Sequence, residues 1–142
     1  MIRLLIIFLF FVLTPPSLSA QTGVWGTLSM LQYDRNADGT INPEGKFIPM
    51  IQKLEGQEIA LRGYMIPLSG KREQSNFMFS AYPYANCFFC GNAGPESIME
   101  VFMKDDKAIQ FSERIIELKG VFHFQPGNGE ITYRMEEARL VK

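Results

Sequence analysis

Cys87 and Cys90 are the only two cysteines in the chain, and they form a C-x-x-C pair. Two thiolates at this spacing suit one tetrahedral zinc or copper(I) ion, but they fill only part of its coordination shell. The other ligands could come from Glu96 in the same loop, from Glu100, from a second subunit or from His123, the single histidine. Zinc is the candidate cofactor. The predicted metal ligands are Cys87, Cys90, Glu96 and His123.

Two other interpretations of the cysteine pair remain open. In thiol–disulfide exchange Cys87 would attack and Cys90 would resolve the mixed disulfide, but reactive pairs usually precede a helix whose dipole lowers the first thiol's pKa. Here glycines, Pro95 and a predicted strand follow, which argues against a thioredoxin-like mechanism. In the structural interpretation the pair forms a disulfide or packs as two thiols. A c-type haem site is excluded because Gly91, and not histidine, follows Cys90.

Residues 1–20 have the three-part pattern of a secretory signal peptide: a short basic start, the apolar run Leu4–Leu13 and a small-residue segment that ends at Ala20. The apolar run is shorter than the roughly 20 residues that a membrane-spanning helix needs. We therefore expect cleavage after Ala20 and a periplasmic or secreted protein. The mature chain is expected to be a single domain over residues 21–142, with no membrane span after signal cleavage.

Composition narrows the class of partner. The chain has 14 basic and 15 acidic side chains, a net charge of −1, and no basic cluster denser than Lys71-Arg72. Nucleic acid is therefore not an expected partner, because its binding depends on many Lys and Arg contacts to phosphate. No catalytic triad, phosphate-binding glycine loop or carboxylate pair is recognisable in the sequence. We therefore predict that the protein is not an enzyme.

The segment Asp34–Gly39 resembles the first half of a calcium-binding EF-hand loop, since Asp, Asn and Asp alternate before a glycine. The match fails at the last ligand, where Gly45 stands in place of the required glutamate and Glu44 lies one position early. The same residues are favoured in a polar turn. We expect a turn here and leave calcium binding open.

Alternating apolar residues predict a mainly β protein. The expected elements are a short helix over 47–56 and strands over 24–33, 58–68, 77–83, 98–103, 116–124 and 131–140. A small OB-fold-like β-barrel of five to six strands with one short helix fits these elements best. Gly63 and Gly120 lie inside strands, where glycine lets a short sheet coil and close. Pro126–Gly129 predicts a hairpin turn, and a phase slip at Glu136-Glu137 predicts a bulge in the last strand.

Three motifs resemble a family of exported bacterial proteins, the domain of unknown function 3299 (DUF3299), in the branch found in Bacteroidetes. These are Leu61-x-Gly63-Tyr64-x-Ile66-Pro67-Leu68, Cys87-Phe88-Phe89-Cys90-Gly91-x-Ala93-Gly94-Pro95-Glu96-Ser97 and Leu118-x-Gly120. The resemblance implies a periplasmic or membrane-anchored small β domain with no established catalytic activity and some association with metal transport. In the better-known branch a histidine follows the first cysteine at the position of Phe89. A site in this branch would therefore use the thiolate of Cys90 in place of an imidazole.

Taken together, these patterns predict an exported binding protein that acts through its C-x-x-C loop. Its partner is predicted to be a metal ion, zinc or copper, within a metal-transport system, or another protein of the cell envelope. The alternatives are a periplasmic thiol–disulfide redox protein and a non-catalytic structural domain whose loop is stapled by a disulfide.

Overall fold

The computed structural model describes residues 23–31, 37–38, 49–125 and 133–141. The predicted signal peptide and the hairpin turn at Pro126–Gly129 lie outside the described residues. So does the calcium-like segment, apart from Ala37 and Asp38. In the part of the chain that is described, no helix is both long and apolar enough to cross a membrane.

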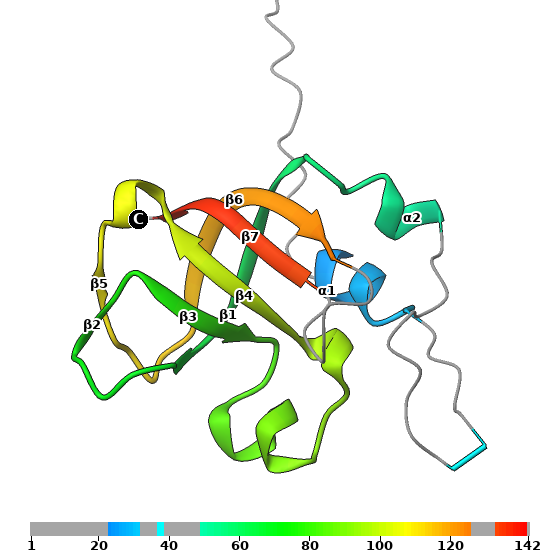
Figure 1. The fold of residues 1–142 in the computed structure, drawn as a ribbon, viewed down its shortest axis with the longest axis horizontal. Helices are drawn as coiled ribbons and strands as arrows, with labels where there is room; N and C mark the ends of the chain where they lie inside the picture. Colours follow the sequence, from blue (N-terminus) through cyan, green and yellow to red (C-terminus); the bar gives the residue numbers. More distant parts are fainter. Residues whose placement is uncertain (1–22, 32–36, 39–48, 126–132, 142) are drawn as a thin grey trace, which may run out of the picture.

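Five strands close into a barrel, which confirms the predicted mainly β, OB-like architecture. Around the barrel the order is β1-β3-β4-β7-β6, and β6 pairs again with β1 (Figure 1). All neighbours are antiparallel except β4 and β7, which are parallel. The barrel strands are β1 (Glu58–Pro67), β3 (Asn76–Ser80), β4 (Ile98–Met103), β6 (Ile116–Phe124) and β7 (Tyr133–Leu140).

The two predicted strand glycines lie where a strand changes its partner or its register. Gly63 is the last residue of β1 that pairs with β6, and the next residue, Tyr64, pairs with β3. A Cβ at Gly63 would lie 2.5 Å from the carbonyl oxygen of Ser80, so only glycine allows this approach. Gly120 faces the predicted bulge, which the structure confirms as a register shift against β7, with Glu137 at φ 54°.

The connection between β1 and β3, residues 68–75, contains a short strand that we did not predict. This strand, β2 (Glu73–Gln74), pairs with β5 (Ile109–Gln110) in a separate two-stranded sheet. The buried amide of Gln74 donates to the carbonyl oxygens of Ser69 and Lys71 and fixes the loop. One turn of 3-10 helix, η4 (Lys104–Asp106), links β4 to this small sheet.

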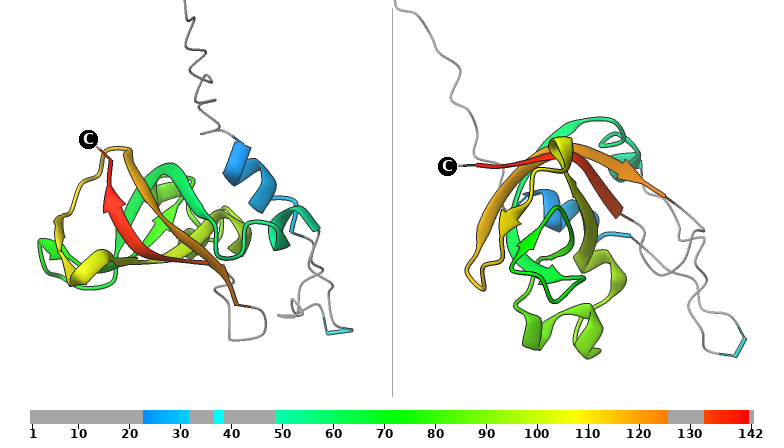
Figure 2. Two further views of the ribbon diagram at one scale, coloured as in Figure 1. Left: turned by 90° about the horizontal axis from the view of Figure 1, so that it is seen from above. Right: turned by 60° about the vertical axis from the view of Figure 1, so that its left-hand side comes forward.

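The strand predicted over residues 24–33 is wrong, because Gly23–Leu28 forms a helix, α1. Its apolar residues pack against one end of the barrel rather than in a sheet: Leu28 is fully buried, and the Tyr133 hydroxyl donates to the Leu28 carbonyl oxygen at 2.8 Å. Tertiary contacts thus override a sequence pattern that also suits a strand. The predicted helix over 47–56 is present as α2 (Pro49–Gln52), which lies at the same end of the barrel (Figure 2).

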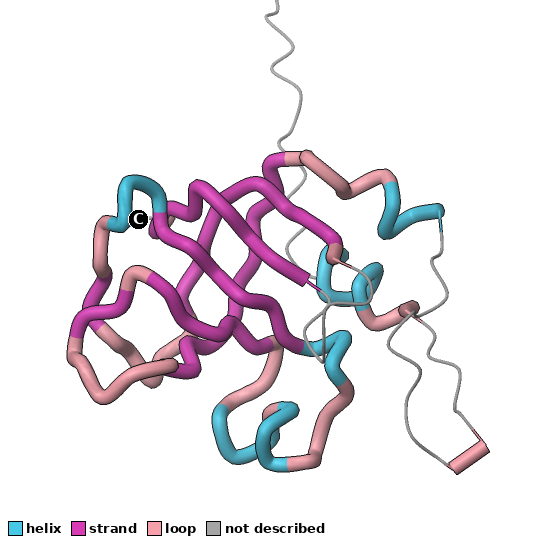
Figure 3. Tube along the Cα trace, in the orientation of Figure 1, coloured by secondary structure: helices cyan, strands magenta, loops and turns pink. Residues whose placement is uncertain are grey.

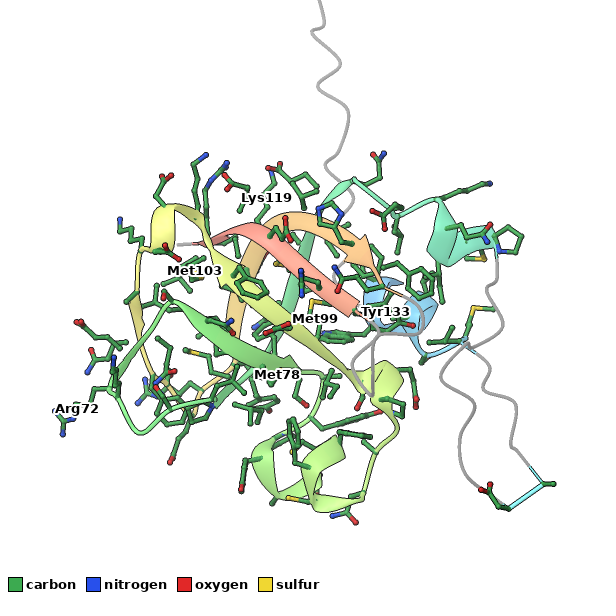
Figure 4. The ribbon with its side chains drawn as sticks, in the orientation of Figure 1. Arg72, Met78, Met99, Met103, Lys119 and Tyr133 are labelled. Carbon is green, nitrogen blue, oxygen red and sulfur yellow. The ribbon has the colours of Figure 1, made fainter. Side chains whose placement is uncertain are left out.

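The main core fills the barrel and continues into the contact with α1. Met99 and Tyr133 belong to it, while Met78, on β3, lies toward the loop below the barrel (Figure 4). The largest fully buried side chains of this core are Tyr133, Phe77, Phe79, Phe122, Leu28, Ile51, Leu61, Met99, Leu118 and Met135.

Candidate functional site at the cysteine loop

The two cysteines lie in the cysteine loop, which we define as residues 81–97 between β3 and β4. The loop consists of three turns of 3-10 helix, visible as short helical segments in Figure 3. These are η1 (Tyr84–Asn86), η2 (Phe88–Cys90) and η3 (Pro95–Ser97). Gly91 ends η2 in the left-handed region at φ 74°, which favours glycine there. No α-helix follows Cys90, so the dipole that activates thioredoxin-like thiols is missing from this loop.

Cys87 is a core residue. Its side chain is fully buried in a second, smaller cluster with Ile66, Met78 and Ile98, and half-buried Phe88 packs against them. Ile66, Met78 and Ile98 belong to β1, β3 and β4, where neighbouring residues such as Met65, Phe79 and Met99 point into the barrel. The cluster therefore sits on the outer face of these strands, and the cysteine loop covers it.

Cys90 has a different environment, since its residue is exposed and its Sγ donates a hydrogen bond to the carbonyl oxygen of Tyr84 at 2.9 Å. Partial desolvation of the sulfur raises the pKa of the Cys90 thiol, and the neighbouring Cys87 raises it further. Both cysteines are free thiols. The loop thus stabilises Cys90 as a neutral hydrogen-bond donor and not as a thiolate.

Further hydrogen bonds close the loop on itself. The side-chain amide of Asn92 donates to the carbonyl oxygen of Ala85 at 3.0 Å. The backbone N–H of Cys90 donates to the carbonyl oxygen of Cys87, and that of Gly91 to Phe88. Asn92 therefore has a structural role in this arrangement.

Glu96, the third predicted ligand, lines a small pocket with Trp25 and Tyr82. Glu100, the alternative ligand, lies on β4 and contacts Asn76 and Arg134, with Arg134 Nη2 at 3.5 Å. No three His, Cys, Asp or Glu side chains within the described ranges form a group that could hold a metal ion.

His123, the fourth predicted ligand, lies on β6 and faces two carboxylates. Its Nδ1 is 2.8 Å from Glu55 Oε1, and its Nε2 is 3.8 Å from Glu136 Oε2. The second Glu55 oxygen accepts the backbone N–H of Phe124 at 2.7 Å. These contacts join the turn after α2 to the end of β6. The structure therefore brings Cys87 and Cys90 together, while metal binding by the predicted set remains a prediction.

The aromatic residues of the loop divide between core and surface. Phe88 packs on the small cluster and meets Phe89 edge-on at 5.6 Å between ring centroids. The exposed fractions are 49% for Tyr82, 64% for Tyr84 and 51% for Phe89. The sequence did not indicate which of these rings would face solvent. It also missed Trp25 beside Glu96, because Trp25 is distant in the chain and was predicted to lie in a strand.

No family model and no curated protein matches the chain. Among solved structures, the chain resembles the crystal structure of a DUF3299 family protein from Pseudomonas aeruginosa PAO1, with a TM-score of 0.51 and 21% sequence identity. The match covers 71% of this chain and 70% of the other. This likeness shows that the two proteins share a fold, and it agrees with the family resemblance of the loop and strand motifs.

Proposed function

We propose that the protein is an exported, non-enzymatic binding module of the DUF3299 kind, and that its cysteine loop docks a protein of the cell envelope. The observation that carries this proposal is the exposure of Tyr82, Tyr84 and Phe89 on one loop. Buried Cys87 anchors this loop on the outer face of the barrel. The signal-peptide pattern supports a location outside the cytoplasm, and the lack of a recognisable catalytic motif favours binding over catalysis.

Exposed aromatic rings favour a protein partner. Tyr and Phe are enriched at protein interfaces, because they bury a large area while losing few rotatable bonds. The loop is also preorganised: Cys87 anchors it in the small cluster, and Asn92 and Cys90 bond to its own carbonyl oxygens. A preordered loop loses less conformational entropy when it binds, so more of the contact energy contributes to affinity.

The cysteines support the loop in this proposal. An attacking thiol needs access and a thiolate, but Cys87 is fully buried and the Cys90 pKa is raised. Redox activity is therefore less well supported than packing. A closed disulfide between the same residues is compatible with docking, because the aromatic rings would keep the same support.

Metal handling is a second candidate, supported by the closeness of the two thiols. Cys87 is near enough to contribute to the raised pKa of Cys90, and soft thiolate pairs select copper(I) or zinc. Intact mass spectrometry of the reduced, tag-free protein under native and denaturing conditions tests this candidate. A stoichiometric copper or zinc adduct that disappears on denaturation would support it, and an apo mass after metal addition would reject it.

Photocross-linking in cells tests the docking proposal. A photoreactive amino acid is placed at Phe89 and, as a matched control, at Ile115, which is 48% exposed before β6. We expect a discrete high-mass adduct from position 89 only, and we expect Tyr84→Ser to abolish it in the same background. Equal adducts from both positions, or an adduct insensitive to Tyr84→Ser, would reject docking through the loop.

A further inference from the structure

A pocket of about 180 Å³ lies between α1, the segment after β3, and η3. Its lining includes Trp25 and Ser29 from the N-terminal region, Tyr82 from the cysteine loop, and Glu96 and Ser97 from η3. This volume is smaller than the ~300 Å³ lower limit of drug-sized sites, so the pocket suits a group of side-chain size.

Among the side-chain donors of the pocket, the Trp25 indole and both serine hydroxyls are used within the protein, and the exposed Tyr82 adds one hydroxyl. The Trp25 indole N–H donates to the carbonyl oxygen of Arg62 at 2.9 Å. The Ser29 hydroxyl donates to Gly26, and the Ser97 hydroxyl donates to Gly94. A hydroxyl has one donor and two acceptor lone pairs, so both serines are left as acceptors.

Several backbone N–H groups around the pocket are also used. Those of Ser29 and Ser97 donate to carbonyl oxygens within their own turns, and that of Ala81 donates to Ser97. The N–H of Tyr82 donates to the Ser80 hydroxyl at 3.1 Å. The serine, indole and carboxylate groups therefore offer acceptor atoms and aromatic surface to a ligand. These groups do not suit an anion.

Glu96 supplies the charge of the pocket. Its side chain is half-buried, and it has no hydrogen-bond or ion-pair partner among the described residues. Its carboxylate lies against Gly94, in the space that a Cβ at this position would occupy. A carboxylate that lines the same pocket as two aromatic rings matches a cation that carries its own N–H donors.

We propose that this pocket binds an alkylammonium group, and that its occupant is a lysine side chain of the protein that docks on the cysteine loop. Tyr82 belongs both to the exposed aromatic surface and to the pocket, so one partner can contact both. This inference rests on the proposed function for the identity of its occupant, but the affinity of the pocket for alkylammonium is testable without a partner.

Trp25 is the only tryptophan of the chain, so its fluorescence reports directly on this pocket. We expect n-butylammonium to change the Trp25 emission saturably, n-butanol to have no such effect, and tetramethylammonium, which lacks N–H donors, to bind more weakly. Glu96→Gln should weaken n-butylammonium binding by about tenfold or more, because a charge-assisted hydrogen bond is lost.

Gly94→Ala is a second variant that keeps the charge but displaces the carboxylate, and it should weaken binding similarly. Glu73→Gln, at an exposed residue of β2, is the matched control and should leave binding unchanged. Unchanged affinity in both Glu96→Gln and Gly94→Ala, or equal binding of n-butanol, would overturn the pocket assignment.

The ammonium group could belong to a protein side chain or to a free small amine. A lysine peptide with capped ends distinguishes these two sources. Competition between this peptide and n-butylammonium supports a protein side chain as the occupant. Binding of free n-butylammonium alone would show that the pocket takes small amines and would overturn the partner assignment. A failed cross-link from position 89 with intact ammonium binding would reject loop docking while keeping the pocket.

Discussion

The barrel interior and the small cluster under the cysteine loop are both apolar, but different elements enclose them. The interior is surrounded by five paired strands and closed at one end by α1. The small cluster has strands on one side only, and the cysteine loop forms the other side. The barrel interior is therefore enclosed without the cysteine loop, whereas the loop depends on the outer face of the barrel for its conformation.

The largest expected effect comes from emptying the barrel interior. Phe122 is fully buried and contacts Tyr133 at 5.6 Å between ring centroids. Phe122→Ala should lower the free energy of unfolding by about 3–5 kcal/mol, because it removes apolar contacts and leaves a cavity. Chemical denaturation measures this loss. Phe89→Ala, at an exposed ring of the cysteine loop, is the control and should change stability by less than about 0.5 kcal/mol.

A smaller effect is expected where β1 changes partners. Gly63→Ala places a methyl group 2.5 Å from the Ser80 carbonyl oxygen and 3.0 Å from the Phe79 ring. We expect a loss of about 1–3 kcal/mol in the free energy of unfolding, because backbone must move to relieve the contact. Gly70→Ala, which has open space around it, is the matched control. Equal denaturation midpoints for the two variants would show that β1 can change partners at this position without glycine.

Substitutions at the two cysteines should differ in their effect on the free energy of unfolding, measured by chemical denaturation under reducing conditions. Cys87→Ser buries a hydroxyl in an apolar cluster and should cost about 1–2 kcal/mol. Cys90→Ser leaves an exposed donor near the Tyr84 carbonyl oxygen and should change stability by less than about 0.5 kcal/mol. Equal losses would contradict the view that only Cys87 is a core residue.

The smallest effect is a pH dependence carried by Cys90. Desolvation and the nearby Cys87 raise the pKa of Cys90 in the folded protein. A group whose pKa is raised on folding stabilises the protein below its unfolded pKa, and this contribution is lost as the pH rises through the folded pKa. Thiolate absorbance should therefore appear at higher pH in the folded than in the denatured Cys87→Ala variant, because desolvation, the larger cause, remains without Cys87. A lower folded pKa would favour redox activity.

Local patterns were sufficient to predict most of the barrel. Strands β1, β4 and β6 lie where alternation of apolar residues predicted them, because one face of each must enter the core. The bulge in β7 was predicted from the phase slip at Glu136-Glu137, since an extra residue exchanges the two faces of a strand. The strand predicted at Gly23–Leu28 failed because a short apolar segment suits either a strand or a capping helix, and only its packing against the barrel end decides.

The candidate site also divides into features that can be recognised in the sequence and features that depend on the fold. The sequence by itself determined the C-x-x-C pair, the mid-strand glycines and the loop between two strands, because these depend on neighbours in the chain. The folded structure was needed to show that Cys87 is buried while Cys90 is exposed, that His123 faces Glu55, and that Glu96 and Trp25 line one pocket. Each of these contacts joins residues or surfaces that the closure of the barrel brings together, and the spacing of residues along a chain does not record that closure.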